Sequence, residues 1–115
     1  MRDRTYLCTF TAIAALCACA SVPHLTPAAT KVRQITPDEA KGCNFLQVVQ
    51  YTDTLAGMGK SPGLVHQAGD VGLRNEIGSI GGNAFVSTQA DADWFWGHVN
   101  YSGEAYRCPE GKPRN

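Results

Sequence analysis

The placement of five cysteines is the feature that most constrains this chain of 115 residues. Cys8, Cys17 and Cys19 lie close together near the start, whereas Cys43 and Cys108 enclose most of the remaining sequence. A chain of this length holds one domain with a small hydrophobic core. A covalent link between the two distant cysteines would therefore matter for its stability, and such links persist only in oxidising compartments.

The N-terminal residues 1–18 have the three parts of an export signal. The first four residues carry two arginines and one aspartate, residues 6–18 are largely apolar, and small residues gather at the end of this run. This order is typical of a secretory signal peptide. The apolar run is also shorter than the roughly 20 residues that a membrane-spanning helix needs.

Two cleavage sites fit the end of this segment. Leu16 to Cys19 resembles a bacterial lipobox, which predicts cleavage before Cys19 and acylation of its thiol. The alternative is the pattern Ala18-Cys19-Ala20, with cleavage after Ala20 and release of a soluble periplasmic or secreted protein. We favour the lipobox because Cys19 stands where a flexible tether begins. Ala20 rather than aspartate follows Cys19, and by resemblance to other lipoproteins of Gram-negative bacteria this implies a lipid anchor at the periplasmic face of the outer membrane.

After cleavage at either site, Cys43 and Cys108 are the two cysteines left with a free thiol, because Cys19 is either acylated or removed. An oxidising compartment would pair them, and closing a loop that runs from residue 43 to residue 108 stabilises a fold by about 4 kcal/mol. A redox or metal site is the less favoured alternative, because the sequence has no CxxC and no histidine at ligand spacing from either cysteine.

The mature chain divides into a tether, one domain and a tail. Residues 19–30 are rich in proline, alanine, serine and threonine without periodicity, which predicts a flexible tether. Residues 31–109 form the domain, and residues 110–115 are a polar tail.

The domain sequence predicts an α+β fold with a small mixed or antiparallel sheet of three to four strands, one main helix and one disulfide. The expected strands are residues 31–35, 43–51, 83–89 and 98–108. Apolar residues on both faces of 43–51, with Phe45, Val49 and Tyr51 on one of them, predict an interior strand.

Two helices are expected between these strands. Thr36 followed by Pro37 predicts the start of a short helix. Residues 64–80 have the periodicity of a longer helix, which Asp70 could cap and which Gly81-Gly82 ends. If the strands that hold Cys43 and Cys108 run antiparallel side by side, the two sulfur atoms can meet without strain.

Several short segments occur in a familiar order: Cys43–Leu46 entering a strand, Leu73–Ile77 on a helix, Gly81–Ala84 after it and Gly103–Cys108 at the end. Over Lys31 to Cys108 the chain resembles a family of small bacterial envelope lipoproteins whose domain has no assigned function. That family is related in fold to the outer-membrane stress-sensing lipoprotein of the Rcs phosphorelay. The resemblance implies a non-enzymatic envelope protein with a periplasmic or outer-membrane protein partner, and envelope-stress sensing as a candidate role.

An acidic and aromatic patch is expected at a hairpin tip, formed by Asp91, Asp93, Trp94, Phe95 and Trp96. In one interpretation the rings fold back and cover the small sheet. In the other they stay exposed and contact a protein partner or lipid head groups, since tryptophan is favoured at interfaces. The two aspartates lack the further ligands of a calcium loop.

The sequence contains little that indicates nucleic-acid binding, a metal site or catalysis. The formal net charge of +0 argues against nucleic-acid binding. His24, His66 and His98 are scattered, so no metal site is expected. Asp70 and Glu104 have no accompanying nucleophile arrangement, and Gly57–Ser61 lacks the glycine spacing of a phosphate-binding loop. We therefore expect no enzymatic activity and no cofactor.

Overall fold

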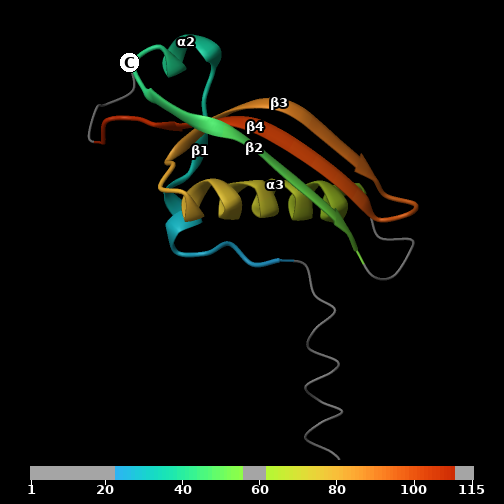
Figure 1. The fold of residues 1–115 in the computed structure, drawn as a ribbon. Helices are drawn as coiled ribbons and strands as arrows, with labels where there is room; N and C mark the ends of the chain where they lie inside the picture. Colours follow the sequence, from blue (N-terminus) through green and yellow to red (C-terminus); the bar gives the residue numbers. More distant parts are fainter. Residues whose placement is uncertain (1–22, 56–61, 111–115) are drawn as a thin grey trace, which may run out of the picture.

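One long helix lies across one face of a twisted sheet in the computed structural model, which describes residues 23–55 and 62–110 (Figure 1). The described helical segments are η2 (Ala28–Lys31), α2 (Pro37–Ala40) and α3 (Pro62–Ser79). The described strands are β1 (Arg33–Gln34), β2 (Asn44–Thr54), β3 (Ala84–Asp93) and β4 (His98–Arg107). The signal segment, Cys19 and Gly57–Ser61 lie outside the described residues, as does the tail from residue 111.

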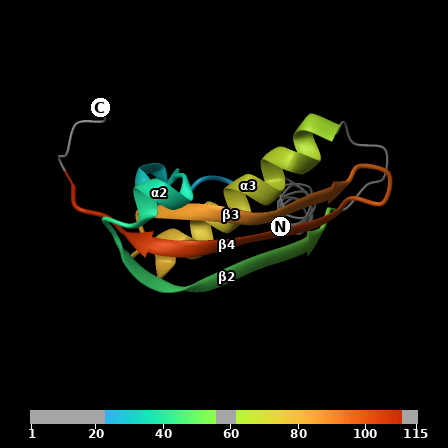
Figure 2. The same ribbon diagram turned by 90° about the horizontal axis from the view of Figure 1, so that it is seen from above.

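The described strands form one four-stranded sheet in the order β1-β3-β4-β2. β4 pairs antiparallel with β2 on one side and with β3 on the other, and β1 pairs parallel with β3. The sheet is therefore mixed, and the expected α+β class with one main helix and one disulfide is confirmed. Figure 2 shows α3 crossing one face of the sheet and α2 above the opposite face.

The main core lies between α3 and the sheet. Leu73 and Ile77 of α3 are buried against Phe85 and Tyr101 of the central strands. Two glycines allow the helix to come this close, since a Cβ at Gly69 would overlap the Tyr101 ring and one at Gly72 would overlap the Tyr51 ring.

A second cluster lies on the opposite face, beneath α2. Thr36 and Glu39 form a capping box, in which the Glu39 amide donates to the Thr36 hydroxyl at 3.3 Å and the Thr36 amide donates to the Glu39 carboxylate at 3.4 Å. The helix start expected at Thr36 and Pro37 is therefore confirmed. α2 is only four residues long, and it brings buried Ala40 to Val86 and Cys108.

The strand expected to be interior is instead the edge strand β2. A bulge between Phe45 and Gln47 shifts the alternation of side chains, so Phe45 does not share the helix face with Val49 and Tyr51. Phe45 and Val48 are 54% and 63% exposed. Apolar residues on both faces predict cover on both faces, but here one apolar face is open, so the prediction of an interior strand is wrong.

The domain also begins earlier than expected. Residues 23–30, which the sequence assigned to a flexible tether, pack along α3. Ala29 is fully buried, the Thr26 amide donates to Asn75 at 2.9 Å, and the Asn75 amide donates to the His24 carbonyl at 2.8 Å. Alanine and proline carried no periodic signal here because a short 3₁₀ turn fixes the segment, not a long amphipathic element.

The main helix runs two residues longer at its start than expected, and Asp70 does not cap it. Asp70 lies in mid-helix, where it accepts a 2.9 Å bond from Arg74 one turn later. The predicted stop is correct: Gly81 has φ +86°, a conformation that favours glycine.

Candidate functional site

The acidic and aromatic patch lies at the tip of the hairpin between β3 and β4. Asp93 holds the turn, since its carboxylate accepts from the Phe95 amide at 2.9 Å and from the Trp96 amide at 3.3 Å. The Gly97 amide donates to the Asp93 carbonyl at 2.8 Å, and the φ of +74° at Gly97 closes the turn. The hairpin tip is thus fixed by local hydrogen bonds, and Asp93 is a structural residue of the tip.

Three consecutive aromatic rings project from this turn. Trp94, Phe95 and Trp96 are 50%, 51% and 54% exposed, and none belongs to a buried cluster. Neighbouring rings meet edge to face, with centroids 5.8 Å and 5.0 Å apart. Of the two arrangements that the sequence allowed, the rings adopt the exposed one, and we call them the aromatic tip.

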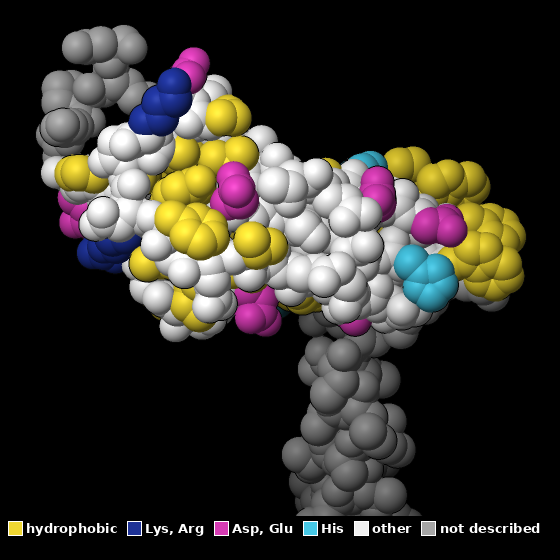
Figure 3. Space-filling model, turned by 45° about the horizontal axis from the view of Figure 1, so that its top comes forward, with side chains coloured by type: hydrophobic (Ala, Val, Ile, Leu, Met, Phe, Trp, Pro, Cys, Tyr) yellow, Lys and Arg dark blue, Asp and Glu magenta, His cyan; other side chains and the backbone are white. Residues whose placement is uncertain are grey.

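The surroundings of the aromatic tip are acidic. Asp91 accepts a 2.6 Å hydrogen bond from Gln89, and both residues belong to β3. Asp53 lies at the end of β2, where its carboxylate accepts from the Thr54 amide. His98 faces Thr54 at 2.9 Å. Figure 3 shows hydrophobic side chains massed at this end of the molecule beside acidic and histidine side chains. Residues 91–98 and β2 contain no lysine and no arginine. The described part of the site is therefore apolar with an acidic rim.

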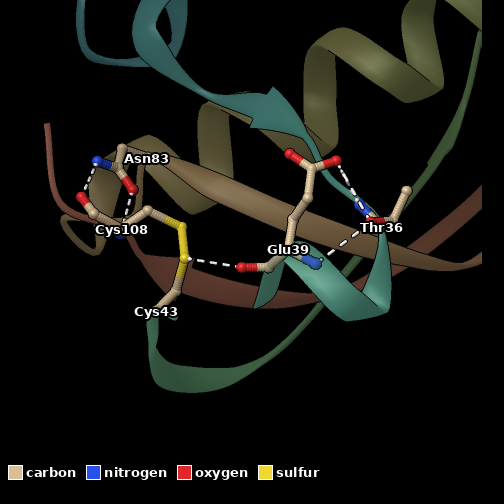
Figure 4. Close-up of a disulfide and its surroundings, with 5 residues drawn as sticks. All are labelled: Thr36, Glu39, Cys43, Asn83 and Cys108. Carbon is tan, nitrogen blue, oxygen red and sulfur yellow. Dashed lines mark hydrogen bonds between the residues drawn. A yellow bond between two sulfur atoms is a disulfide. The ribbon is translucent and has the colours of Figure 1, made fainter. Parts of the chain in front are cut away.

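The disulfide lies at the opposite end of the sheet, where β2 begins and β4 ends (Figure 4). Cys43 and Cys108 are bonded, with their Cα atoms 4.3 Å apart, as expected. Asn83, directly before β3, reaches the same place. Its amide donates to the Cys108 carbonyl at 2.8 Å, and its carbonyl oxygen accepts from the Cys108 amide at 2.7 Å.

An open cleft lies between the N-terminal half of α3 and β3, where β1 is too short to cover the sheet edge. Its volume is about 430 Å³, and Gln67, Asp70 and Ser87 line it together with a hydrogen-bonded pair, His66 and Tyr101. The His66 ring nitrogen and the Tyr101 hydroxyl are 2.6 Å apart. Burial raises the pKa of Tyr101, and the charges of Asp70 and Asp91 add to this, so the phenol stays protonated at neutral pH.

The cleft does not bring together the carboxylates considered as an acid and base pair. Asp70 lies on α3, whereas Glu104 lies on the other face of the sheet, where Tyr106 donates to it. Besides the His66 and Tyr101 pair, the polar residues of the cleft are two glutamines, a serine and an aspartate that is ion-paired with Arg74. Among the described residues of the cleft there is no cysteine, and the hydrogen-bond partner of His66 is Tyr101 and not the serine. This arrangement could hold a small polar molecule, but its described residues contain no acyl- or phosphoryl-transfer constellation.

No group of three or more metal-ligating side chains occurs within residues 23–55 and 62–110. Within the same ranges, no helix has the length and apolar character required to cross a membrane.

We found no match to this chain among known protein families, curated proteins or solved structures.

Sequence reasoning missed two contributors to these surfaces. It did not connect Asn83 with Cys108, although the Asn83 side chain ties the turn before β3 to the end of the neighbouring strand β4. It also did not pair His66 with Tyr101, which are 35 positions apart. No short sequence pattern predicts either contact, because each joins two distant segments that the folded sheet brings together.

Proposed function

We propose that this chain is a non-enzymatic bacterial envelope lipoprotein that presents its α+β domain to a protein partner. In this proposal residues 1–18 direct export, Cys19 carries the lipid, and the domain faces the periplasm from the outer membrane. The partner binds the aromatic tip and is a periplasmic or outer-membrane protein. Envelope-stress sensing is the role that the resemblance to the lipoprotein family adds.

The observation that carries the proposal is the exposed aromatic tip. Three large rings, each about half exposed, project from a turn that hydrogen bonds to Asp93 hold in place. Tryptophan and other aromatic side chains dominate the energetics of protein interfaces, and a preorganised turn loses little entropy when it binds. The acidic rim favours a partner whose groove is apolar with basic residues at its edge.

The disulfide supports export. Such bonds persist in the periplasm and outside the cell, whereas cytosolic thiols are kept reduced. A domain of this size also gains a large fraction of its stability from one bridge that closes so long a loop.

The anchor is tested by labelling cells with an alkynyl fatty acid. The wild-type chain and Cys17→Ala, a matched control that removes the neighbouring thiol, should label and fractionate with membranes. Cys19→Ala should lose both properties. Undiminished labelling of Cys19→Ala would reject the anchor.

The alternative function is a soluble secreted or periplasmic binding module, which the Ala18-Cys19-Ala20 pattern favours. The intact mass of the native protein separates the two. An unmodified chain that begins at Ser21 supports release, whereas a diacylglycerol-bearing chain that begins at Cys19 supports the anchor.

The partner site is tested by placing a photo-crosslinking amino acid at Trp96 and, as a matched control on the same sheet, at exposed Thr88 of β3. Irradiation of cells should give a discrete crosslinked protein from position 96 and none from position 88. Equal crosslinking at both positions, or none at 96, would remove the aromatic tip as the binding site.

A further inference from the structure

The cleft between α3 and β3 has no part in the proposed function. Its volume of about 430 Å³ lies within the range of sites that hold small molecules. β1 pairs with only the first two residues of β3, and the chain then turns at Ile35 toward α2 on the opposite face of the sheet. Beyond Phe85, no described strand pairs with this side of β3. The N-terminal half of α3 forms the other wall of the cleft.

Polar side chains from three elements line the cleft without being used inside the domain. Gln34 of β1, Gln67 of α3 and Ser87 of β3 make no side-chain hydrogen bond with any described residue. His66 uses its Nδ1 atom for the Tyr101 hydroxyl, which leaves Nε2 without a partner among the described residues. Amide, hydroxyl and imidazole groups can donate as well as accept hydrogen bonds. The walls therefore offer a ligand both kinds of hydrogen bond.

The charges around the cleft are balanced. Asp70 is the one carboxylate among the described lining residues, and it accepts from the Arg74 Nε atom at 2.9 Å. Arg74 is held in turn by the Val32 carbonyl, to which it donates, and its Cζ atom lies 5.3 Å from the centroid of the Phe85 ring. The described lining contains no lysine or arginine that could bind a phosphate or a carboxylate. A cation gains little, because Asp70 is already paired. The cleft therefore favours a neutral ligand over either kind of ion.

We propose that this cleft binds a neutral hexose sugar, alone or as one ring of a larger saccharide. Sugar hydroxyls donate and accept at the same time, which matches the groups on the walls. The floor is small and apolar, formed by Phe85 and Ala90, and suits the C–H face of a sugar ring. The open mouth leaves part of the ligand in water, which favours a hydrophilic molecule over an apolar one. The inference is independent of the lipid anchor and of the partner at the aromatic tip, since no lining residue belongs to that tip.

Titration of the oxidised, isotope-labelled protein with glucose, galactose and mannose tests the ligand class. At least one of these sugars should shift the NMR signals of Gln34, Gln67 and Ser87, with a Kd of about 1–10 mM. The uronate of that sugar should bind at least about tenfold more weakly, because it brings a second carboxylate to Asp70. If none of the three sugars shifts these signals at its highest soluble concentration, the proposal is overturned. Equal binding of the uronate would overturn it as well.

Two variants test the place of binding. Gln67→Ala removes one amide from the wall and should weaken binding about three- to tenfold. Alanine favours helix and Gln67 is exposed, so folding is preserved. Gln47→Ala, the same change at an exposed glutamine of β2, is the matched control and should bind as the wild-type chain does.

Ala90→Phe places a ring on the floor of the cleft and should abolish binding. Ala90 is exposed, so the new ring fills the cleft and not the core, which circular dichroism and an intact Cys43–Cys108 bond verify. Full binding by either cleft variant would overturn the proposal. So would an equal loss of binding in Gln47→Ala, because the sugar would then lie elsewhere on the domain.

Discussion

The two ends of the sheet are held together by different kinds of contact. At the disulfide end, Cys43 and Cys108 are bonded, Asn83 ties a helix stop to Cys108, and α2 covers a small buried cluster. At the other end, the hairpin is held by its own turn, and three aromatic rings project without joining a core cluster. Long-range contacts fix the disulfide end. At the other end, local bonds shape the turn that carries the rings, and a single backbone bond from the Leu55 amide to the Gly97 carbonyl, at 2.8 Å, links the base of that turn to the end of β2.

The difference separates stability from recognition. Residues whose partners lie far away in the sequence should matter for folding, whereas exposed rings on a locally fixed turn can change with little effect on folding. A domain of this size has a small core. Concentrating stabilising contacts at one end leaves the other end available for a binding surface.

The largest expected effect comes from the disulfide. Replacing both cysteines, Cys43→Ala with Cys108→Ala, should lower the free energy of unfolding by about 4 kcal/mol, because the unfolded chain loses a loop closure that joins residues 65 positions apart. Chemical denaturation of the variant and of the wild-type chain measures this loss. Reducing the disulfide of the wild-type protein should lower the free energy of unfolding by a similar amount. A loss below about 1 kcal/mol would contradict the view that this end stabilises the domain.

Asn83 should have the next largest effect. Asn83→Ala removes two hydrogen bonds with the backbone of Cys108 and leaves those partly buried groups unpaired, which should cost about 1–3 kcal/mol. Asn75→Ala is the matched control, since Asn75 also makes two hydrogen bonds to backbone groups but at an exposed site. Thermal unfolding should place the Asn83 variant clearly below the Asn75 variant. If both variants lose the same stability, the hydrogen bonds at the disulfide end contribute no more than those at an exposed site.

A smaller effect is expected at the capping box of α2. Thr36→Ala removes the hydroxyl that accepts from the Glu39 amide and should cost about 1 kcal/mol. Thr36→Ser keeps the oxygen and should unfold close to the wild-type chain in the same denaturation experiment. If serine and alanine destabilise equally, the threonine methyl group rather than the cap is responsible.

The sequence predicted those parts of the fold that depend on neighbouring residues. The helix start at Thr36, the helix stop at Gly81 and the hairpin between β3 and β4 each have a local pattern, and all three are present. The pairing of Cys43 with Cys108 followed from counting cysteines and from the expected antiparallel strands, and it is confirmed.

What the sequence did not predict depends on the topology of the whole sheet. The edge position of β2 follows from the strand order, and the bulge at Phe45 is a property of its pairing with β4. The docking of residues 23–30 needed Asn75 on a helix that comes much later in the chain. At the candidate site, the three rings lie at a hairpin tip as expected, whereas Asp91 pairs with Asn100 inside β3, which extends to Asp93 and not only to residue 89. The sequence does not decide whether the rings are exposed, because either arrangement of three rings is compatible with the same turn sequence.

The smallest expected effect on stability, and the largest on binding, falls at the aromatic tip. Trp96→Ala removes a ring that is 54% exposed and in contact with Phe95, so the free energy of unfolding should change by less than about 0.5 kcal/mol. Phe85→Ala, a change to a ring that is 2% exposed in the main core, is the contrasting control and should destabilise strongly. In cells, a photo-crosslinker at Trp94 should lose its partner when Trp96→Ala is added, although the domain remains folded. If Trp96→Ala instead unfolds the domain as Phe85→Ala does, the rings stabilise the hairpin, and the aromatic tip is a structural element of the sheet. If the variant stays folded and the partner still crosslinks, recognition lies elsewhere on the molecule.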